Sequence, residues 1–204
     1  MNGTVAVVQY NAGNIRSVVC ALNRLGIEPL VTDDPGKLRE AGRVIFPGVG
    51  EAKSAMEYLD SRGLSKVLRE LTQPFLGICL GLQLMCLHSE EHDTPVLGMF
   101  RENVLKFPPE DKVPHMGWNR ITGLDNPLFA GIPEGSYVYF VHSYYVASGP
   151  DTIASCRYIR PFSAALGRGN FFGTQFHPEK SGAVGQQLLS NFLNLEADPR
   201  TRKE

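Results

Sequence analysis

The sequence contains few cysteines, and their arrangement matches neither a metal site nor a disulfide framework. Only 4 of its 204 residues are cysteine, and no two of them form a Cys-x-x-Cys pair. Small disulfide-stabilised domains carry many more cysteines, and structural zinc sites repeat such pairs. We therefore expect no metal and a reducing compartment, which we take to be the cytoplasm.

An excess of charge of either sign is also missing. The chain has 20 Lys and Arg residues against 21 Asp and Glu, a formal net charge of −1. It therefore lacks the basic field that attracts nucleic acid or an anionic membrane surface. No apolar run approaches the roughly 20 residues of a membrane-spanning helix, and the first residues enter a strand-like segment without a secretory signal. We expect neither nucleic acid nor a membrane as a partner.

Hydrophobic residues make up 43% of the chain, which is enough for one ordinary core. Short apolar runs alternate with amphipathic segments in its first half, a pattern typical of a parallel α/β sheet. The predicted strands cover residues 4–10, 27–32, 43–46 and 75–78, and the predicted helices cover 15–25, 52–59, 64–71 and 80–88. We predict one domain over residues 1–196 and a polar tail over 197–204.

The regular alternation breaks at about residue 89, where prolines begin to separate short β-like pieces. This part, to about residue 135, is predicted to be a β-rich elaboration on the same domain. Strand patterns return at 136–142, 152–156 and 170–176, and a final helix is predicted at 183–195. The fold class is therefore α/β, with a mainly parallel sheet flanked by helices.

A small-x-Cys-x-small pentapeptide, Gly77-Ile78-Cys79-Leu80-Gly81, stands where the fourth strand meets a helix. This is the pattern of a nucleophile elbow, in which the glycines make room for a very tight turn. Such a turn places the sulfur at a helix N-terminus, which favours a thiolate. The alternative is a buried structural cysteine between incidental glycines. Three other cysteines lie on apolar faces and are predicted to be packing residues: Cys20, Cys86 and Cys156.

A thiolate needs a base, and His177 has the most suitable context of the five histidines. It ends an apolar strand and is followed by Pro178 and Glu179. Residues two apart in an extended segment point to the same side, so the carboxylate can hold one imidazole nitrogen while the other faces the sulfur. A strand-ending histidine with a solvated glutamate is the alternative for this tripeptide alone. For His142 a simple hydrogen bond and a ligand contact both stay open.

Backbone N–H groups are also needed to stabilise a tetrahedral oxyanion. Pro47-Gly48-Val49-Gly50 follows the third strand, at the edge where parallel sheets place their sites. Its glycines allow the backbone to turn N–H groups toward a ligand. A plain glycine-rich connection is the alternative.

Taken together, the elbow, its continuation to Gln83 and the late His177-Pro178-Glu179 resemble the class I, triad-type glutamine amidotransferases. The resemblance covers nearly the whole chain. It implies a flavodoxin-like core and hydrolysis of the glutamine side-chain amide through a thioester on Cys79. It also implies delivery of the ammonia to an acceptor, with no cofactor.

Four further segments resemble one branch of that family, the glutaminase subunits of imidazole glycerol phosphate synthases. They are residues 10–18, 47–50, 114–119 and 139–144. This resemblance implies a heterodimer with a (β/α)8-barrel cyclase subunit. Because the chain has no GxxxxGK[ST] phosphate loop, the acceptor chemistry is expected in another chain.

The resemblance also implies residue roles. The triad is Cys79, His177 and Glu179, and the oxyanion hole is formed by Gly48, Val49, Gly50 and Leu80. Glutamine is held by Gln83, Glu91, Ser143 and Tyr144. The partner interface and ammonia gate comprise Asn11, Asn14, Trp118, Tyr139 and Lys180.

Two competing interpretations are weighed against this one. The first is the glutaminase subunit of another amidotransferase, such as anthranilate or aminodeoxychorismate synthase; the Gly-Val-Gly loop and the Met-Gly-Trp-Asn segment argue against it. The second is a catalytically silent regulatory subunit. The intact Cys79, His177 and Glu179 argue against that one.

Overall fold

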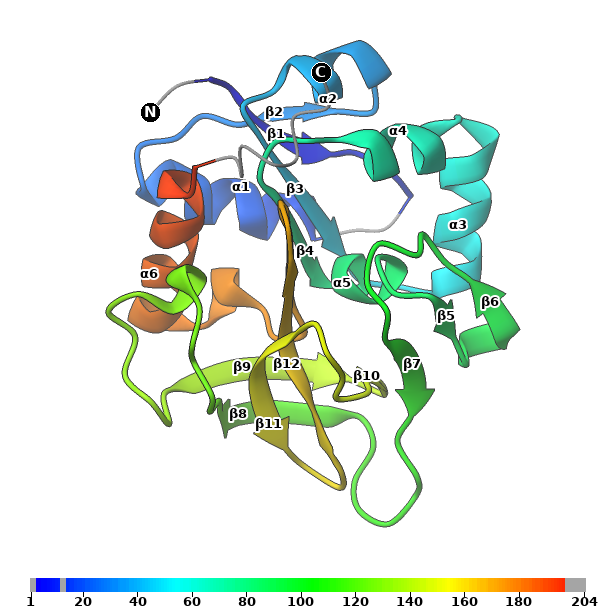
Figure 1. The fold of residues 1–204 in the computed structure, drawn as a ribbon, viewed down its shortest axis with the longest axis vertical. Coiled ribbons are helices and arrows are strands. Elements are labelled where there is room, and N and C mark those ends of the chain that lie inside the picture. Colours follow the sequence, from blue (N-terminus) through cyan, green and yellow to red (C-terminus); the bar gives the residue numbers. More distant parts are fainter. Residues whose placement is uncertain (1–2, 12–13, 197–204) are drawn as a thin grey trace.

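The computed structural model describes residues 3–11 and 14–196 (Figure 1). The predicted polar tail, 197–204, lies outside the described residues. Seven strands form the central sheet, in the order β11-β12-β13-β4-β3-β1-β2. Their bounds are Val5–Val8 (β1), Leu30–Thr32 (β2), Arg43–Gly48 (β3), Phe75–Cys79 (β4), Thr152–Arg157 (β11), Pro161–Arg168 (β12) and Phe171–Thr174 (β13).

The part of this sheet that carries the site is parallel. Strands β2, β1, β3, β4 and β13 pair in parallel, while β11 and β12 form an antiparallel edge. The predicted mainly parallel α/β sheet is therefore confirmed. Since β4 and β13 are neighbours, the segments that follow them, at Cys79 and at residues 175–177, meet at the same end of the sheet.

Helices cover both faces of the sheet, and each face has its own hydrophobic core. Along β1 the side chains alternate, with Ala6 and Val8 in one core and Val5 and Val7 in the other. The first core is covered by α2 (Pro35–Glu40), α3 (Ala52–Ser61), α4 (Leu64–Glu70) and α5 (Leu80–Leu84). The second is covered by α1 (Ile15–Arg24) and α6 (Gly182–Asn194), which lie together on the left in Figure 1.

The predicted β-rich elaboration consists of two small sheets. One is β10-β7-β5-β6, formed by Tyr144–Val146, Asn103–Lys106, His88–Ser89 and Thr94–Pro95. The other is the antiparallel ribbon of β8 (His115–Arg120) and β9 (Tyr137–His142). The elaboration therefore extends past residue 135, because β9 pairs with β8 and β10 pairs with β7. Short 3-10 turns lie at Glu91–Asp93 (η1), Pro127–Phe129 (η2) and Pro178–Lys180 (η3).

Three local expectations were wrong. The helix predicted over residues 80–88 ends at Leu84, because the backbone then bonds to residues 97–102 and enters the second sheet. Strand β12 was not expected, since its small residues give no alternating pattern. Cys20 is exposed rather than packed, because it lies opposite the buried side of α1.

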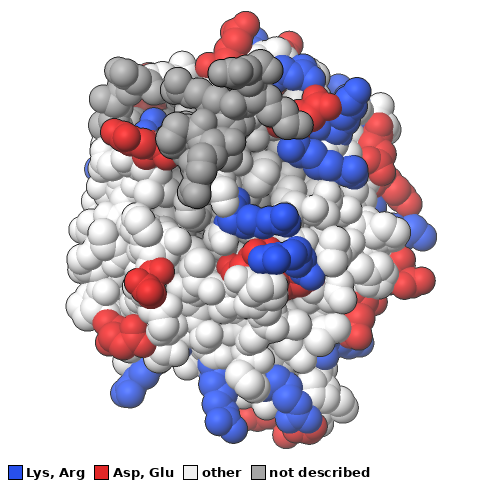
Figure 2. Space-filling view, viewed as in Figure 1, with Lys and Arg blue, Asp and Glu red and all other residues white. Residues whose placement is uncertain are grey.

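Charges of both signs lie next to one another on the face shown in Figure 2, as the balanced composition suggests. No helix among the described residues is long and apolar enough to cross a membrane.

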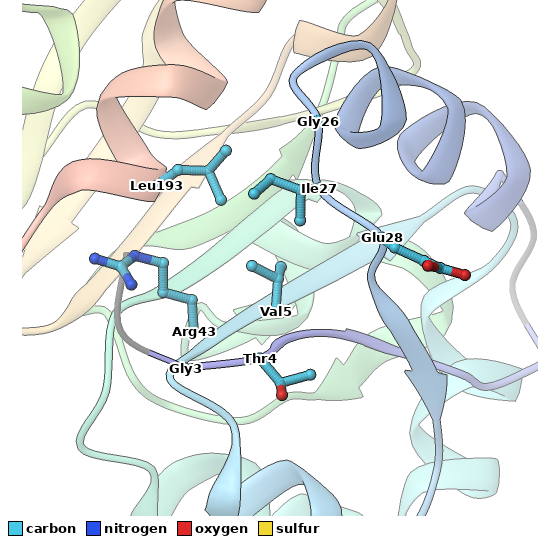
Figure 3. A pocket seen from close by; sticks show the side chains of 8 residues that line it. All are labelled: Gly3, Thr4, Val5, Gly26, Ile27, Glu28, Arg43 and Leu193. Atoms are coloured by element: carbon cyan, nitrogen blue, oxygen red, sulfur yellow. The ribbon is translucent and has the colours of Figure 1, made fainter.

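A small cavity opens at the amino ends of β1 and β3, opposite the end where Cys79 lies. It has a volume of about 240 Å³, and the side chains of Val5, Ile27 and Leu193 point toward one another around it (Figure 3). The Arg43 guanidinium, at its rim, donates to the carbonyls of Phe192 at 3.4 Å and Leu195 at 2.8 Å. Arg43 thus ties the start of β3 to the last turn of α6.

We expect Arg43→Met to lower the free energy of unfolding by about 1–3 kcal/mol, because both α6 carbonyls lose a charged donor. Arg43→Lys should lose less, since the charge is kept but the planar fork is not. Urea unfolding measures both variants. A Met variant as stable as the wild type would show that this contact contributes nothing.

Candidate active site

Cys79 stands in a sharp, strained turn between β4 and α5. Its backbone has φ 54° and ψ −108°, which lies outside the regions that residues with a side chain normally adopt. Such conformations cost on the order of 1–3 kcal/mol and persist only where the surroundings enforce them. The structure shows the expected tight turn, with Cys79 directly before a helix.

The two flanking glycines are required by close backbone contacts. A methyl group on Gly81 would collide with the carbonyl oxygen of Phe46 on β3. One on Gly77 would lie 2.5 Å from the Met85 sulfur and 2.8 Å from the Leu82 nitrogen. The elbow therefore fits against β3 and the first turns of α5 only because these positions have no side chain.

His177 is buried, and its Nδ1 lies 2.8 Å from Oε1 of the equally buried Glu179. The carboxylate only accepts, so Nδ1 carries the proton and Nε2 is left for the sulfur. Nε2 is buried and makes no well-aligned hydrogen bond within residues 3–11 and 14–196. Burial lowers the pKa of His177, but the negative charges of Cys79 and Glu179 outweigh it and raise this pKa to about 10. The ring is thus suited to hold a proton opposite a thiolate.

The His177–Glu179 contact forms for a different reason from the one expected from the sequence. His177 is extended, but Glu179 lies in the 3-10 turn η3, so the two do not share one face of an extended segment. The turn bends the chain so that the carboxylate returns to the imidazole.

Asn14 also contacts Glu179. Its Nδ2 donates to Glu179 Oε1 at 2.5 Å, across 165 residues of sequence. From the sequence, Asn14 was expected in the partner interface, and this contact with Glu179 was not predicted. By contrast, Asn11 donates to the Ser54 carbonyl of α3 at 3.1 Å.

A cavity of about 330 Å³ opens beside Cys79. Three of the predicted oxyanion residues line it: Val49, Gly50 and Leu80. All of the predicted glutamine-binding residues line it too: Gln83, Glu91, Ser143 and Tyr144. Pro114, Val141 and His142 complete the wall and were not assigned to it from the sequence. This size is typical of a small-molecule site.

The fourth predicted oxyanion residue, Gly48, does not line the cavity but stands next to Cys79. It is the last residue of β3 and pairs in register with Cys79. The Tyr10 hydroxyl donates to the Pro47 carbonyl at 2.7 Å and holds the strand end. Gly50 has φ 123°, a conformation that favours glycine. The sequence thus lets the loop turn back over the cavity.

A buried amide, Gln175, was missed by the sequence reasoning. Its Nε2 lies 3.9 Å from the Cys79 sulfur, and its Oε1 accepts from Gln83 Nε2 at 3.1 Å. Gln83 Nε2 also donates to the Tyr144 carbonyl at 2.9 Å. Both amide hydrogens of Gln83 are therefore used inside the protein, and only the Gln83 side-chain oxygen is available to a ligand. The available signal was a glutamine near the end of the predicted strand 170–176, two positions before His177.

His142 makes the hydrogen bonds expected of it in one of its two interpretations, and it also lines the cavity. Its Nδ1 lies 2.8 Å from the Tyr144 carbonyl, and its Nε2 lies 3.0 Å from His115 Nδ1. Burial lowers the pKa of His142 to about 3 and that of His115 to about 4, so both rings are neutral. The carbonyl only accepts, so each bond has one direction: Asn119 donates to His115, His115 to His142, and His142 to Tyr144.

The outward face of the β8–β9 ribbon carries exposed apolar side chains and ends at the Arg120–Tyr137 pair. The pairs Met116–Val141 and Trp118–Tyr139 lie side by side on it. Met116 is 59% exposed and Trp118 55%. Lys180 lies 5.8 Å from the centre of the Tyr139 ring. The fold therefore brings together three predicted interface residues: Trp118, Tyr139 and Lys180. Met116 shares their face because side chains alternate along β8, so the period-2 pattern of the sequence could have identified it.

Among the described residues, no group of three or more His, Cys, Asp or Glu side chains could hold a metal ion.

The chain matches the class-I glutamine amidotransferase family over residues 6–195. The chain belongs to the class-I glutamine amidotransferases. The family that the motifs resembled is thereby confirmed.

This amidotransferase is also similar to full-length curated proteins. It is 55% identical over 194 residues to an imidazole glycerol phosphate synthase subunit HisH of Bacteroides fragilis (strain YCH46), covering 94% of this chain and 99% of that protein. It is 43% identical to the subunit of the same name from Shewanella oneidensis, covering 94% of this chain and 96% of that one. The resemblance to this branch of the family is confirmed.

Solved structures share the fold of this amidotransferase at low sequence identity. A crystal structure of a glutamine amidotransferase superposes with a TM-score of 0.74 and 21% identity, over 94% of this chain and 97% of that one. PurLQS from Thermotoga maritima superposes with a TM-score of 0.71 and 20% identity, over 95% and 99%.

Stability of this amidotransferase should depend on His115 at acid pH. The pKa of His115 is about 4 in the folded state and 6.5 in the unfolded state. Its contribution to the free energy of unfolding is therefore complete above pH 6.5 and is lost as the pH falls toward about 4. Between pH 6 and 4.5 the free energy of unfolding of the wild type should therefore fall more steeply than that of His115→Gln, by roughly 1.4 kcal/mol per pH unit. Urea unfolding across this range measures both slopes. Equal slopes would show that His115 titrates alike in both states.

Proposed function

We propose that this chain is the glutaminase subunit of an imidazole glycerol phosphate synthase in the cytoplasm. It hydrolyses glutamine to glutamate and ammonia and passes the ammonia to a cyclase subunit, which makes imidazole glycerol phosphate and AICAR in histidine biosynthesis. One observation carries the proposal: an elbow cysteine with a buried His177–Glu179 pair stands at the end of a cavity lined by polar groups. The similarity to HisH subunits supports the choice of synthase. The need for a free thiol supports the reducing compartment.

In the first half-reaction, His177 Nε2 takes the proton of the Cys79 thiol, and the sulfur attacks the side-chain carbonyl carbon of glutamine. The oxyanion that forms is stabilised by backbone N–H groups of the 48–50 loop and of Leu80. His177 Nε2 then gives its proton to the amide nitrogen. The C–N bond breaks, ammonia leaves, and a γ-glutamyl thioester is left on Cys79.

In the second half-reaction, His177 takes a proton from water, which attacks the thioester carbon. The C–S bond breaks, the sulfur takes the proton from His177 Nε2, and glutamate leaves. Glu179 holds the imidazole in one tautomer through both steps, because Nδ1 donates to it throughout.

The amino-acid end of glutamine carries both charges, and the cavity offers partners of suitable kinds. Glu91 Oε2 accepts from the Ala52 backbone nitrogen at 2.7 Å, at the start of α3. The carboxylate is thus fixed in the wall, with Oε1 free to bind the α-ammonium group. The Gln83 oxygen adds a second acceptor, and Ser143 supplies donors for the α-carboxylate.

The cyclase subunit, a (β/α)8 barrel, is proposed to bind the apolar face of the β8–β9 ribbon as a heterodimer. Exposed aromatic residues of this kind are typical of protein interfaces. The face borders the nucleophile, since the Val141 carbonyl lies 3.9 Å from the Cys79 sulfur. Ammonia released there would reach the partner without crossing open water, where it would be protonated and lost.

Cys79→Ala should lower glutamate release by at least about 10⁴-fold, because the attacking atom is gone. Glutamate is measured for the pure chain, and then with the cyclase subunit and its phosphoribulosyl aminoimidazole carboxamide ligand. We expect weak release by the wild type alone and strong stimulation by the partner. Synthesis from added ammonia should survive in the variant complex. Loss of that synthesis as well would make Cys79 structural, and stimulation only by a chorismate-using synthase would move the chain to another amidotransferase.

Trp118→Ala should weaken binding of the cyclase subunit by about 2 kcal/mol, roughly 30-fold, if this face is the interface. Leu87→Ala serves as the matched control, since Leu87 is 49% exposed but lies outside the ribbon. Calorimetric titration gives both dissociation constants. Equal constants for the two variants would place the partner elsewhere.

A further inference from the structure

We infer that Asn14 is a positioning residue of the catalytic triad, which holds the Glu179 carboxylate in the orientation that His177 requires. This inference rests on the proposed function, because it assigns a role in glutamine hydrolysis. It differs from the role that the family resemblance implied for Asn14, a place in the partner interface.

The first observation is the shared acceptor. Glu179 Oε1 receives the hydrogen bonds of both Asn14 Nδ2, at 2.5 Å, and His177 Nδ1, at 2.8 Å. A carboxylate only accepts, so the Asn14 amide must present its NH2 group. Glu179 Oε2 is buried and has no partner among the described residues. Within the described structure, Asn14 is therefore the one group besides His177 that fixes the rotation of this carboxylate.

The second observation is the conformation of Asn14 itself. It stands directly before α1 with φ 129° and ψ 14°, a region that favours glycine. An asparagine in this place usually caps the helix with its side chain, but Asn14 makes no such bond. Asn14 thus has a strained backbone and no capping hydrogen bond, while its amide donates to a carboxylate 165 positions away in the sequence. Strain of this kind is typically retained where a side chain is needed.

The third observation is the packing that makes the contact possible. Helix α1 packs against η3, the turn that carries Glu179. Asn14 does not line the cavity beside Cys79, whereas the proposed glutamine contacts do. Its loss should therefore change the rate of the chemical steps and leave glutamine affinity unchanged.

The test uses Asn14→Gly and Asn14→Asp in the complex with the cyclase subunit. Glycine accepts the φ of 129° without strain and removes only the amide, so loss of activity cannot be attributed to misfolding. Aspartate keeps the shape but places a second carboxylate beside Glu179. Asn23→Gly, at the exposed far end of α1, is the control for a glycine in this helix.

We expect Asn14→Gly to lower the kcat of glutamine hydrolysis by about 10- to 100-fold, with KM unchanged and the thermal midpoint equal or higher. Asn14→Asp should lose at least as much at pH 8. The dissociation constant of the cyclase complex should stay that of the wild type.

Wild-type kcat in both Asn14 variants would overturn the inference. So would weaker cyclase binding that accounts for the whole loss of rate, since Asn14 would then belong to the interface. An inactive wild-type complex would instead contradict the proposed function, and this outcome is separate because it does not involve Asn14.

Discussion

The structure around Cys79 depends on one close approach, that of the Gly81 backbone to the Phe46 carbonyl on β3. Because no side chain separates them, α5 starts directly at the end of β4, and Cys79 is forced to a positive φ. This turn lifts the sulfur above the sheet edge. It also sets the sulfur beside the 48–50 loop, since Gly48 and Cys79 are in register. The cavity and the position of the imidazole follow from this placement.

The interior near this turn is polar but has defined donor directions. Two neutral histidines, two glutamine amides and one carbonyl form connected hydrogen bonds from the ribbon to the sulfur. Each buried group needs a partner, because an unsatisfied polar group in such surroundings is costly. The chain meets this need with neutral side chains around the proposed nucleophile.

Local motifs made part of the site predictable from the sequence. Gly77, Cys79 and Gly81 are close in sequence, and the physical reason for their spacing operates within one turn. The same holds for His177 and Glu179, although the turn that joins them was not foreseen. By contrast, Gln175 and the histidine pair acquire their contacts from strands far apart in the chain, and Asn14 meets Glu179 only after α1 packs on η3. Strand β12 was missed because its small, buried residues satisfy no periodic template.

The adjacency of β4 and β13 has a consequence for how such a protein can vary. The residues proposed for bond cleavage follow these two neighbouring strands. The long excursion between them supplies most of the cavity wall and the exposed ribbon. Insertions or exchanges within that excursion leave the pairing of β4 with β13 untouched. The fold therefore separates the groups proposed to react from the surfaces proposed to bind a ligand and a partner, so that recognition can change while the hydrolytic chemistry is kept.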